Sequence, residues 1–554
     1  MSIDSFLNEI LRMLEHIFTL FIVVLLTIFL PIKIIFGDKV NVLKILSQMM
    51  KSIFVPVKVI FLHVLSPFFI FIGKSFFGVF VSLFNFVFNW NNSDLQKGAK
   101  FLNSKETKKI VNKSQKGLLI DGNNGRISDI LSFSHSLVVS NAGAGKTSQY
   151  IIPNILTFAS DNEPVSMVIT DPSGEIFEKT SGYLKKQGFT IQVLNPSKPQ
   201  ESLGYNPLAK VETVTDIEEI AHILVESANP DTKDSFWKEG AKIIIQVFIH
   251  CLKSLNKPEF LNLHNVLYLL QNFSDRKAID LFVAINANKT VCGQYKGFIG
   301  GNANTFASFL STATTSLKMF SNTDICKMMS KDEIRFEDMR TVKTALFLIV
   351  PSEKVSYYSF FLNIFYTQLF QACMKNLPKE GDLPIYVLMD EFANIGTISN
   401  FSSILATIRK YKVSLSLILQ DLSQLSSNYG HENMEAILGN TASKLCYGGV
   451  SITTAQYFEK MIGKADNDNK KDKFSQHLIE ASQIRTLPKG KGLFIVSDKN
   501  PILLKKIVPY FQNRKFIEKT KLPVYVFNRD NFVSDIQYLS LEEVNYDSSS
   551  DTIE

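Results

Sequence analysis

From about residue 118 to residue 500, short runs of β-branched and leucine residues alternate with longer stretches of helical periodicity. The short runs have the length of single strands, and the longer stretches have the length of helices. Strands and helices that alternate in this way form a mostly parallel sheet that helices cover on both faces. The pattern therefore predicts an α/β fold. The predicted strands are Ser136–Val139, Val165–Thr170, Thr190–Leu194, Thr344–Val350, Ile385–Met389, Ser414–Leu419 and Leu493–Val496.

One region interrupts this alternation. Between about Val211 and Asn322 the sequence contains no convincing strand, and helical periodicity dominates, as in Phe236–Leu255 and Leu261–Phe273. We therefore expect an all-α insertion that divides the α/β domain into two parts. After Asn531 there are six acidic residues and no Lys or Arg, which predicts a disordered acidic tail. The expected segments are 1–92, 93–211, 212–322, 323–530 and 531–554.

The first 92 residues are more apolar than the rest of the chain. The stretch Ile17–Phe36, interrupted only by one lysine that can snorkel, reaches the length of a membrane-spanning helix. Val59–Gly73, flanked by two lysines, predicts a second span, and Ser75–Trp90 is either a third span or an interfacial segment. A cleaved signal peptide is disfavoured because Ser2–Glu15 is acidic and a second apolar region follows.

Lysines follow the apolar region, and seven of them lie between Lys97 and Lys116. Because basic residues stay on the cytoplasmic side of a membrane, this cluster predicts that the large C-terminal part faces the cytoplasm. The segment between the first two spans is also basic, since Asp38 is its only acid and it contains Lys39, Lys44 and Lys51. Two spans would place this basic segment outside, whereas three spans or an interfacial helix would remove the conflict. The predicted number of spans is therefore two or three.

Composition sets the broad class of the protein. The chain has 554 residues, of which 45% are apolar and 12% aromatic, so it can bury a substantial core and form several domains. Its five cysteines are far apart and form no Cys-x-x-Cys pair, which argues against a disulfide framework or a zinc site. Seven basic and four acidic residues in 1–92 contribute +3 of the net charge of +7. The remaining +4 is too small for a nucleic-acid-binding footprint.

The segment Ser140–Thr147 follows a predicted strand and leads into the predicted helix Thr147–Ala159. This is the context of a phosphate-binding P-loop, in which glycines let backbone N–H groups surround a phosphate at a helix N-terminus. Lys146 would contact the β- and γ-phosphates of ATP, and the Thr147 hydroxyl would bind Mg²⁺. Ser140 stands where the P-loop pattern has its first glycine. The residues expected to bind the nucleotide are Asn141, Ala142, Gly143, Ala144, Gly145, Lys146, Thr147 and Ser148.

The predicted strand Ile385–Met389 ends at Asp390 and Glu391. At the carboxyl edge of a parallel sheet, Asp390 can hold Mg²⁺ together with Thr147. Glu391 can then orient or deprotonate the attacking water. The structural alternative is that Asp390 caps a helix that begins at Phe392.

Two more polar segments follow predicted strands. Gln420 comes directly after one strand, where its side chain can sense the γ-phosphate; an ordinary strand-end turn is the alternative. Asp171–Glu175 follows Val165–Thr170 and lies at the same sheet edge as the P-loop, so it can contribute to the nucleotide pocket or to a subunit interface. The same segment fits a helix N-terminus, with Pro172 at the first position and Glu175 completing the cap. The two functions are compatible.

Together these stretches resemble the TraG/TraD family of type IV secretion coupling proteins, the conjugative DNA-transfer ATPases. The resemblance covers about residues 90–520. It depends on several motifs that occur in the order expected for the family. They are the P-loop running into Ile151–Asn154, then Asp171–Glu175, Tyr205–Leu208, Phe236-Trp237, Thr305-Phe306, Ser311-Thr312, Asp390–Gly396 and Gln420–Leu425.

The resemblance implies a RecA-like P-loop ATPase domain with an all-α insertion and an N-terminal transmembrane hairpin in the bacterial inner membrane. Members of the family assemble as homo-hexamers and use ATP to pass a relaxase–DNA complex or effector proteins to the secretion channel. Their all-α domain faces the cytoplasm and is implicated in contacts with DNA and substrate. The resemblance implies two cofactors, ATP and Mg²⁺.

The resemblance also bears on individual residues. It aligns Arg409, at the end of the predicted helix Phe401–Tyr411, with an arginine that reaches a neighbouring subunit's nucleotide site. The alternative for Arg409 is a solvated cation at a helix end. The expected catalytic residues are thus Glu391, Gln420 and Arg409. Two residues depart from the family pattern, namely Ser140 and Ser173, the latter standing where the family usually has lysine after Asp-Pro.

Two other functions fit part of the pattern. One is a membrane-tethered DNA translocase that is not linked to secretion. The other is a nucleotide-binding scaffold that no longer hydrolyses ATP. Residue patterns alone leave the cargo, DNA or protein, unspecified.

Overall fold

The computed structural model describes residues 98–229, 235–465, 477–527 and 536–542. The chain divides into two compact units, Met1–Lys97 and Gly98–Glu554. The membrane spans predicted for residues 1–92 lie outside the described residues. Within the ranges given above, no helix is long and apolar enough to cross a membrane.

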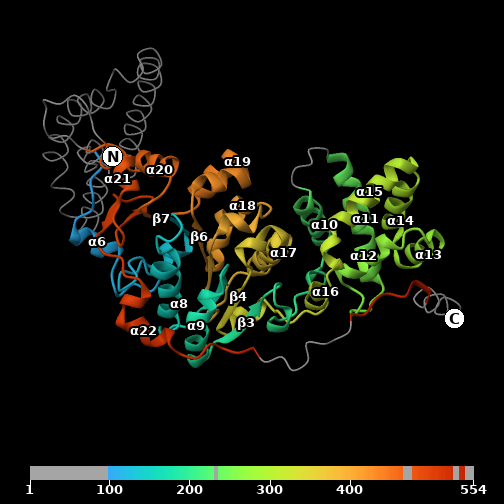
Figure 1. Cartoon of the computed structure of the whole chain (residues 1–554), viewed down its shortest axis with the longest axis horizontal. Helices are drawn as coiled ribbons and strands as arrows, with labels where there is room; N and C mark the ends of the chain where they lie inside the picture. The colour runs from blue at the N-terminus through green and yellow to red at the C-terminus, as the bar shows by residue number, and fades with distance from the viewer. Residues whose placement is uncertain (1–97, 230–234, 466–476, 528–535, 543–554) are drawn as a thin grey trace, which may run out of the picture. The chain divides into compact units, whose positions relative to one another are not determined.

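The second unit is built around a large mixed sheet (Figure 1). Its strand order is β3-β4-β2-β5-β6-β1-β7-β8-β9. All neighbours from β3 to β7 pair in parallel, and β8 and β9 continue the sheet antiparallel. The strands are β1 (Ser136–Val139), β2 (Ser166–Thr170), β3 (Thr190–Leu194), β4 (Thr344–Leu348), β5 (Ile385–Met389), β6 (Val413–Leu419), β7 (Ser443–Tyr447), β8 (Gly492–Val496) and β9 (Ile502–Leu504).

Every strand expected from the sequence is present, and the predicted α/β fold with its parallel sheet is confirmed. Two strands were not expected. In β7, Lys444 interrupts the run of apolar residues, although the structure buries it to 2% exposure. The strand β9 is only three residues long.

The two faces of the sheet bury separate cores, because successive residues of a strand point to opposite faces. In β1, Leu137 and Val139 belong to one core, and Val138 belongs to the other. Both faces are therefore covered by helices (Figure 1). Helices α8 (Ile152–Phe158), α9 (Glu175–Lys186) and α22 (Arg514–Thr520) cover the face of Val138, and α17 (Val355–Met374), α18 (Phe401–Ile408), α19 (Leu422–Gly439), α20 (Ile452–Ile462) and α21 (Ala481–Arg485) contribute to the core on the opposite face. Two short helices, α6 (Ser104–Ile110) and α7 (Asp129–Phe133), precede β1.

Between β3 and β4 in the sequence lies a group of helices, α10 to α16, although the two strands are neighbours in the sheet. The described residues of this group contain no strand. Helix α11 packs against α10, α13, α14 and α15, so it forms the centre of the group. Helix α10 also contacts α17, which joins the group to the sheet core. The helices are α10 (Val214–Ala228), α11 (Ser235–Ser254), α12 (Leu263–Gln271), α13 (Arg276–Asn286), α14 (Lys289–Ile299), α15 (Ala303–Ser316) and α16 (Thr323–Met329).

Residues 536–542 differ from the expected disordered tail, because they pack against this helical group. The side chain of Asn265 accepts a hydrogen bond from the Leu539 amide (2.9 Å) and donates one to the Gln537 carbonyl (3.1 Å). The Asn265 carboxamide thus satisfies one backbone N–H group and one backbone carbonyl of this segment. Leu539 and Leu541 are buried at 2% and 6% exposure, so apolar contacts order this part of the tail despite its acidic surroundings.

Candidate nucleotide-binding site

The loop between β1 and the next helix has the backbone of a P-loop. Gly143 and Gly145 adopt positive φ angles of 71° and 104°, which favour glycine. Ser140 does not adopt a positive φ, so a side chain is compatible with the backbone at this position. Its hydroxyl is buried and donates to the Asn141 carbonyl (3.2 Å). The departure from the P-loop pattern at Ser140 therefore leaves the shape of the loop intact.

Lys146 begins the helix that follows the loop, a π-helical turn over Lys146–Ile151 that continues as α8. Its ammonium group donates to the carbonyls of Ser140 (2.8 Å) and Asn141 (3.3 Å), so it lies at the centre of the loop. Burial lowers the pKa of Lys146, and the nearby carboxylates of Asp390 and Glu391 oppose this effect. A lysine ammonium group that lies against the carbonyls of such a loop is suited to binding phosphate.

Thr147 and Asp390 meet beside the loop. The Thr147 hydroxyl donates to the Asp390 Oδ2 atom (3.3 Å). Asp390 is 6% exposed, and burial raises its pKa to about 7, against the opposing effect of Lys146. The parts of the chain that the structure describes contain no group of three or more His, Cys, Asp or Glu residues that could hold a metal. One hydroxyl and one carboxylate nevertheless fit Mg²⁺, which takes most of its ligands from water and phosphates.

Glu391 follows in a left-handed backbone conformation, with φ 50° and ψ 46°. Three donors hold its carboxylate in place. Gln420 Nε2 donates to Oε1 (3.0 Å), while Ser352 Oγ (3.1 Å) and Asn394 Nδ2 (2.8 Å) donate to Oε2. The short helix after Glu391, Phe392–Ile395, has no side-chain cap, so Asp390 is not the helix cap that was the structural alternative.

Gln420 and Asp421, which follow β6, make different contacts. Gln420 contacts Glu391, so it is part of the polar cluster rather than of an ordinary turn. Asp421 caps α19 by accepting from the Ser423 amide (2.8 Å). The cluster also contains Ser352 and Asn394, which the sequence reasoning did not single out. Ser352 lies just beyond the carboxyl end of β4, and the rule that identified Asp390 would have pointed to it.

The other predicted nucleotide-binding residues surround Lys146. The turn of the loop, residues 141–144, borders a cavity of about 480 Å³. Asn141, Ala142 and Gly143 are exposed, and Ala144 is half-buried. The Ser148 hydroxyl turns back and donates to the Gly145 carbonyl (3.4 Å).

Asp171 stabilises the first turn of α9, whose N-cap residue is Gly174. Its carboxylate accepts from the Phe177 amide (2.8 Å), and burial raises its pKa. The helix begins at Glu175 after Gly174, so Pro172 is not its first residue, and Glu175 does not complete a capping box. Pro172 instead lines a small cavity together with Asp390 and Glu391. The segment thus combines a cap with a position near the carboxylates.

Arg409 is the one predicted catalytic residue that the structure does not bring into this cluster. It is exposed and lies before the first residue of β6, whereas Gln420 follows the last residue. The seven residues of β6 span about 20 Å. Arg409 therefore lies beyond the amino ends of the strands, whereas its own subunit's cluster lies at their carboxyl ends.

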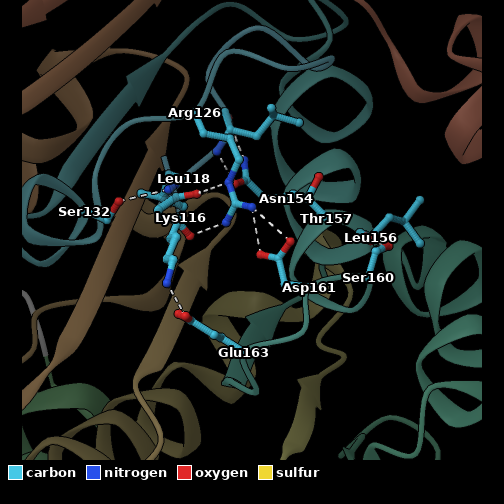
Figure 2. A network of polar contacts seen from close by, with 12 residues as sticks. Lys116, Leu118, Arg126, Ser132, Asn154, Leu156, Thr157, Ser160, Asp161 and Glu163 are labelled. Atoms are coloured by element: carbon cyan, nitrogen blue, oxygen red, sulfur yellow. Dashed lines mark hydrogen bonds and ion pairs between the residues drawn. The ribbon is translucent and has the colours of Figure 1, made fainter. Parts of the chain in front are cut away.

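A buried polar network attaches the segment before β1 to the helix that follows the P-loop (Figure 2). Asn154 accepts from the Leu119 amide (2.7 Å) and donates to the Leu119 carbonyl (2.9 Å). Arg126 pairs with Asp161 (2.8 Å) and donates to the Gly117 carbonyl (2.8 Å). The motif residue Asn154 therefore has a structural function behind the P-loop.

Comparison with known proteins links this geometry to one family. A family model described as "Type IV secretory system Conjugative DNA transfer" matches residues 89–531. The chain is 23% identical over 404 residues to Protein VirD4 of Rhizobium radiobacter, covering 69% of this chain and 57% of that protein. It is 24% identical over 359 residues to the conjugal transfer protein TraG of Escherichia coli, covering 59% of this chain and 55% of that protein. The chain thus spans little more than half the length of these relatives.

Solved structures share the fold. The plasmid coupling protein TrwB in complex with ADP and Mg²⁺ gives a TM-score of 0.59 at 15% identity, over 76% of this chain and 96% of that chain. The unbound monoclinic form of the conjugative coupling protein TrwBdeltaN70 gives a TM-score of 0.60 at 15% identity, over 76% and 95%. TrwB has also been solved with the GTP analogue GDPNP, at a TM-score of 0.59 and 15% identity, over 74% and 94%.

Proposed function

Because the chain belongs to the family of type IV secretory system conjugative DNA-transfer proteins, we propose that it is a membrane-anchored ATPase that couples cargo to a secretion channel. The cargo is a relaxase–DNA complex or an effector protein. One observation carries the enzymatic part of this proposal: Thr147, Asp390 and Glu391 are held together beside the P-loop lysine. This is the arrangement that ATP hydrolysis requires.

Each residue of the cluster contributes to binding or hydrolysis of ATP. The backbone N–H groups of the loop and the Lys146 ammonium bind the β- and γ-phosphates of ATP. Thr147 and Asp390 hold Mg²⁺, which neutralises charge on the phosphates. Glu391 orients the attacking water and accepts its proton. Gln420 donates to the Glu391 carboxylate, and in this proposal it responds to the γ-phosphate.

Assembly completes the proposal. The chain forms a homo-hexamer anchored in the bacterial inner membrane, with residues 98–554 in the cytoplasm, and DNA and channel components are its further partners. In the ring, Arg409 reaches the nucleotide site of the adjacent subunit and stabilises charge in the transition state. Two observations support this: Arg409 is exposed, and it lies at the sheet edge away from its own P-loop.

A cargo-transfer assay tests the coupling function. Cells that lack the chain, but carry its secretion system, are complemented with the full-length wild type or with Glu391→Gln. We expect the wild type to restore transfer of the plasmid or effector to recipient cells. Glu391→Gln should reach the membrane in equal amount and restore at most about one hundredth of the transfer, because hydrolysis is lost.

Two outcomes would contradict the proposal. Full transfer with Glu391→Gln would show that hydrolysis does not drive coupling. In the second outcome, cells that lack the chain transfer cargo at the wild-type level and yet fail to partition DNA within the donor cell. That result would favour a DNA translocase that is not linked to secretion.

A further inference from the structure

Residues 536–542, the tail segment, pack against the start of helix α12, which is far from them in the sequence. Three hydrogen bonds hold the segment on α12, and each is made to its backbone. Asn265 Oδ1 accepts from the Leu539 amide (2.9 Å), and Asn265 Nδ2 donates to the Gln537 carbonyl (3.1 Å). His264 Nε2 donates to the same carbonyl (3.2 Å). The pairing therefore recognises peptide backbone rather than particular polar side chains.

The local structure of α12 directs the Asn265 side chain at the tail segment. Asn262 caps the helix by accepting from the Asn265 amide (3.0 Å). In a capping box, the side chain at the third helical position would return to the amide of the cap residue. Here the Asn262 amide donates to the Phe260 carbonyl (2.9 Å) instead, so the Asn265 carboxamide is available to a peptide. Because Asn265 is fully buried, its carboxamide requires such partners.

Apolar and aromatic contacts add specificity to the backbone pairing. Leu539 and Leu541 are buried in the core of the helical group. The Tyr538 ring packs edge-on against the His264 imidazole, with 5.3 Å between the ring centroids, although the tyrosine is 55% exposed. The segment that fits is thus an aromatic residue followed by Leu-x-Leu. Backbone hydrogen bonds combined with sites for a few side chains are a recurrent mode of peptide recognition.

The contacts with α12 are neutral, although the tail segment lies in an acidic part of the sequence. Burial lowers the pKa of His264 to about 4, against the opposing effect of the Gln537 carbonyl, so the imidazole is uncharged at neutral pH. The Asn265 carboxamide carries no charge either. Salt should therefore have little influence on docking, whereas it would screen the attraction between an acidic peptide and a basic surface.

Docking of the tail segment is a balance of two opposing terms. Burial of two leucines favours the docked form, and the conformational entropy of seven residues favours the released form. Because the two terms are of similar size, both forms are accessible. The released form exposes Asn265 and the sites of both leucines to another polypeptide.

We propose that the α12 surface, formed around His264, Asn265 and Tyr268, is a peptide-docking site that the chain's own tail segment occupies and closes. When the tail segment is released, the site takes a partner protein that presents the same chemistry, an aromatic residue followed by Leu-x-Leu. The tail segment thus acts as a competitor within the chain. This inference does not depend on the proposed ATPase function, because the site lies in the helical group and not at the P-loop.

The test measures the fluorescence anisotropy of a labelled synthetic peptide, with the sequence of residues 534–544, in the presence of the detergent-solubilised full chain. The double variant Leu539→Glu/Leu541→Glu, the open variant, releases the tail segment and leaves the α12 surface unchanged. The peptide should bind the open variant at least about tenfold more tightly than the wild type, because the attached segment competes at an effective concentration of about a millimolar. Added salt should not weaken this binding.

Two further variants locate the bound peptide. Asn265→Ala in the open variant should weaken peptide binding about tenfold, because two hydrogen bonds are lost. Asn286→Ala is the matched control, since Asn286 is also buried in the helical group but donates to a carbonyl of its own helix (2.9 Å), so it should leave peptide binding unchanged. A peptide that keeps Tyr538, Leu539 and Leu541 and has serine elsewhere should bind as well as the native sequence.

Leu539→Pro opens the site by a second route, because it removes the N–H group that donates to Asn265, and it should behave as the open variant does. Equal peptide affinity for the wild type and both variants would overturn the inference, because the tail segment would then not occupy the site. Absence of binding to both variants, or unfolding of both, would show that the segment is a fixed part of the fold. Binding that Asn265→Ala leaves intact, or that salt abolishes, would place the peptide on another surface and would also overturn the inference.

Discussion

Glu391 has the least favourable backbone conformation of the candidate site. Its left-handed φ of 50° is uncommon for a residue with a long side chain, and such conformations concentrate at functional sites. Here the conformation turns the carboxylate toward Ser352, Asn394 and Gln420, which hold it from two sides. The side chain is therefore positioned before any ligand binds, which is what water activation requires.

At the scale of single residues, the sequence predicts the parts of the site that have an obligatory residue type. Glycines at positive φ, a lysine after them and acids at a strand end are such parts. Asn394 escaped prediction because many residue types can donate a hydrogen bond to a carboxylate, whereas the position of Ser352 after a strand end was a signal that the prediction did not use. Ser140 was noted as a departure, but only the backbone angles show that the loop tolerates it.

The raised pKa of Asp390 predicts a pH dependence of Mg²⁺–nucleotide binding. Only the ionised carboxylate favours the metal, and burial raises the pKa of Asp390 to about 7. As the pH falls from 8 to 6, a proton increasingly competes with Mg²⁺, so affinity should fall, approaching tenfold per pH unit below about 7. Calorimetric titration with Mg²⁺–ATP measures this decrease.

Asp390→Asn is the control for that experiment, because it removes the titrating carboxyl but leaves the titration of ATP itself. The variant should bind Mg²⁺–ATP more weakly at pH 8 and show a smaller pH dependence than the wild type. Parallel pH profiles for the two proteins would mean that Asp390 does not titrate in this range.

At the scale of elements, apolar periodicity found seven of the nine strands in the described residues. It missed β9, which is only three residues long, and β7, which buries a lysine. Lys444 is the second residue of β7, and its ammonium group donates to the Thr441 carbonyl (2.6 Å). The prediction of disorder for residues 536–542 failed for a related reason. It relied on the acidic composition of the tail and gave no weight to two leucines, which the helical group buries. In both cases tertiary contacts, which a local pattern does not contain, decide the structure.

Lys444 also yields a prediction about stability. Burial lowers its pKa from the usual value of 10.5 to about 8. A lysine with a lowered folded-state pKa costs stability in full below pH 8, and this cost vanishes as the pH rises above 10.5. Lys444→Met should therefore stabilise the fold by about 1–2 kcal/mol at pH 7, after allowing for the lost hydrogen bond to Thr441.

Thermal unfolding at pH 7 and at pH 10 measures this effect. The gain in Tm should be clear at pH 7 and should shrink at pH 10, where the wild-type lysine is largely neutral. Lys499→Met, which alters a half-exposed lysine just after β8, is the control and should change Tm little at either pH. A loss of stability in Lys444→Met at pH 7 would show that the lysine has a favourable partner that outweighs its burial.

At the scale of the whole molecule, the proposed ring of subunits would account for the position of Arg409, which is exposed and lies away from its own subunit's cluster. If Arg409 acts in trans, Arg409→Ala and Glu391→Gln should each be inactive alone. In a randomly mixed ring, roughly a quarter of the interfaces join an intact Glu391 to an intact Arg409. Activity should then rise well above that of either variant, because an arginine finger contributes about 10³-fold or more.

The measurement is ATP hydrolysis by the two variants before and after mixing, with subunit exchange followed by two fluorescent labels. Mixing each variant with a second preparation of itself is the control. Exchange without a rise in activity would exclude the trans function of Arg409. That result would not affect the ATP binding and hydrolysis that are assigned to the residues of each subunit's own site.

Lys146 binds the nucleotide and Glu391 activates water in the proposed mechanism, and a pair of variants separates the two functions. ATP affinity and single-turnover phosphate release are measured on Lys146→Ala and Glu391→Gln. Lys146→Ala should lose most of its affinity for ATP, whereas Glu391→Gln should bind ATP as the wild type does and release phosphate about 10²-fold to 10³-fold more slowly. Equal loss of ATP binding in both variants would contradict the claim.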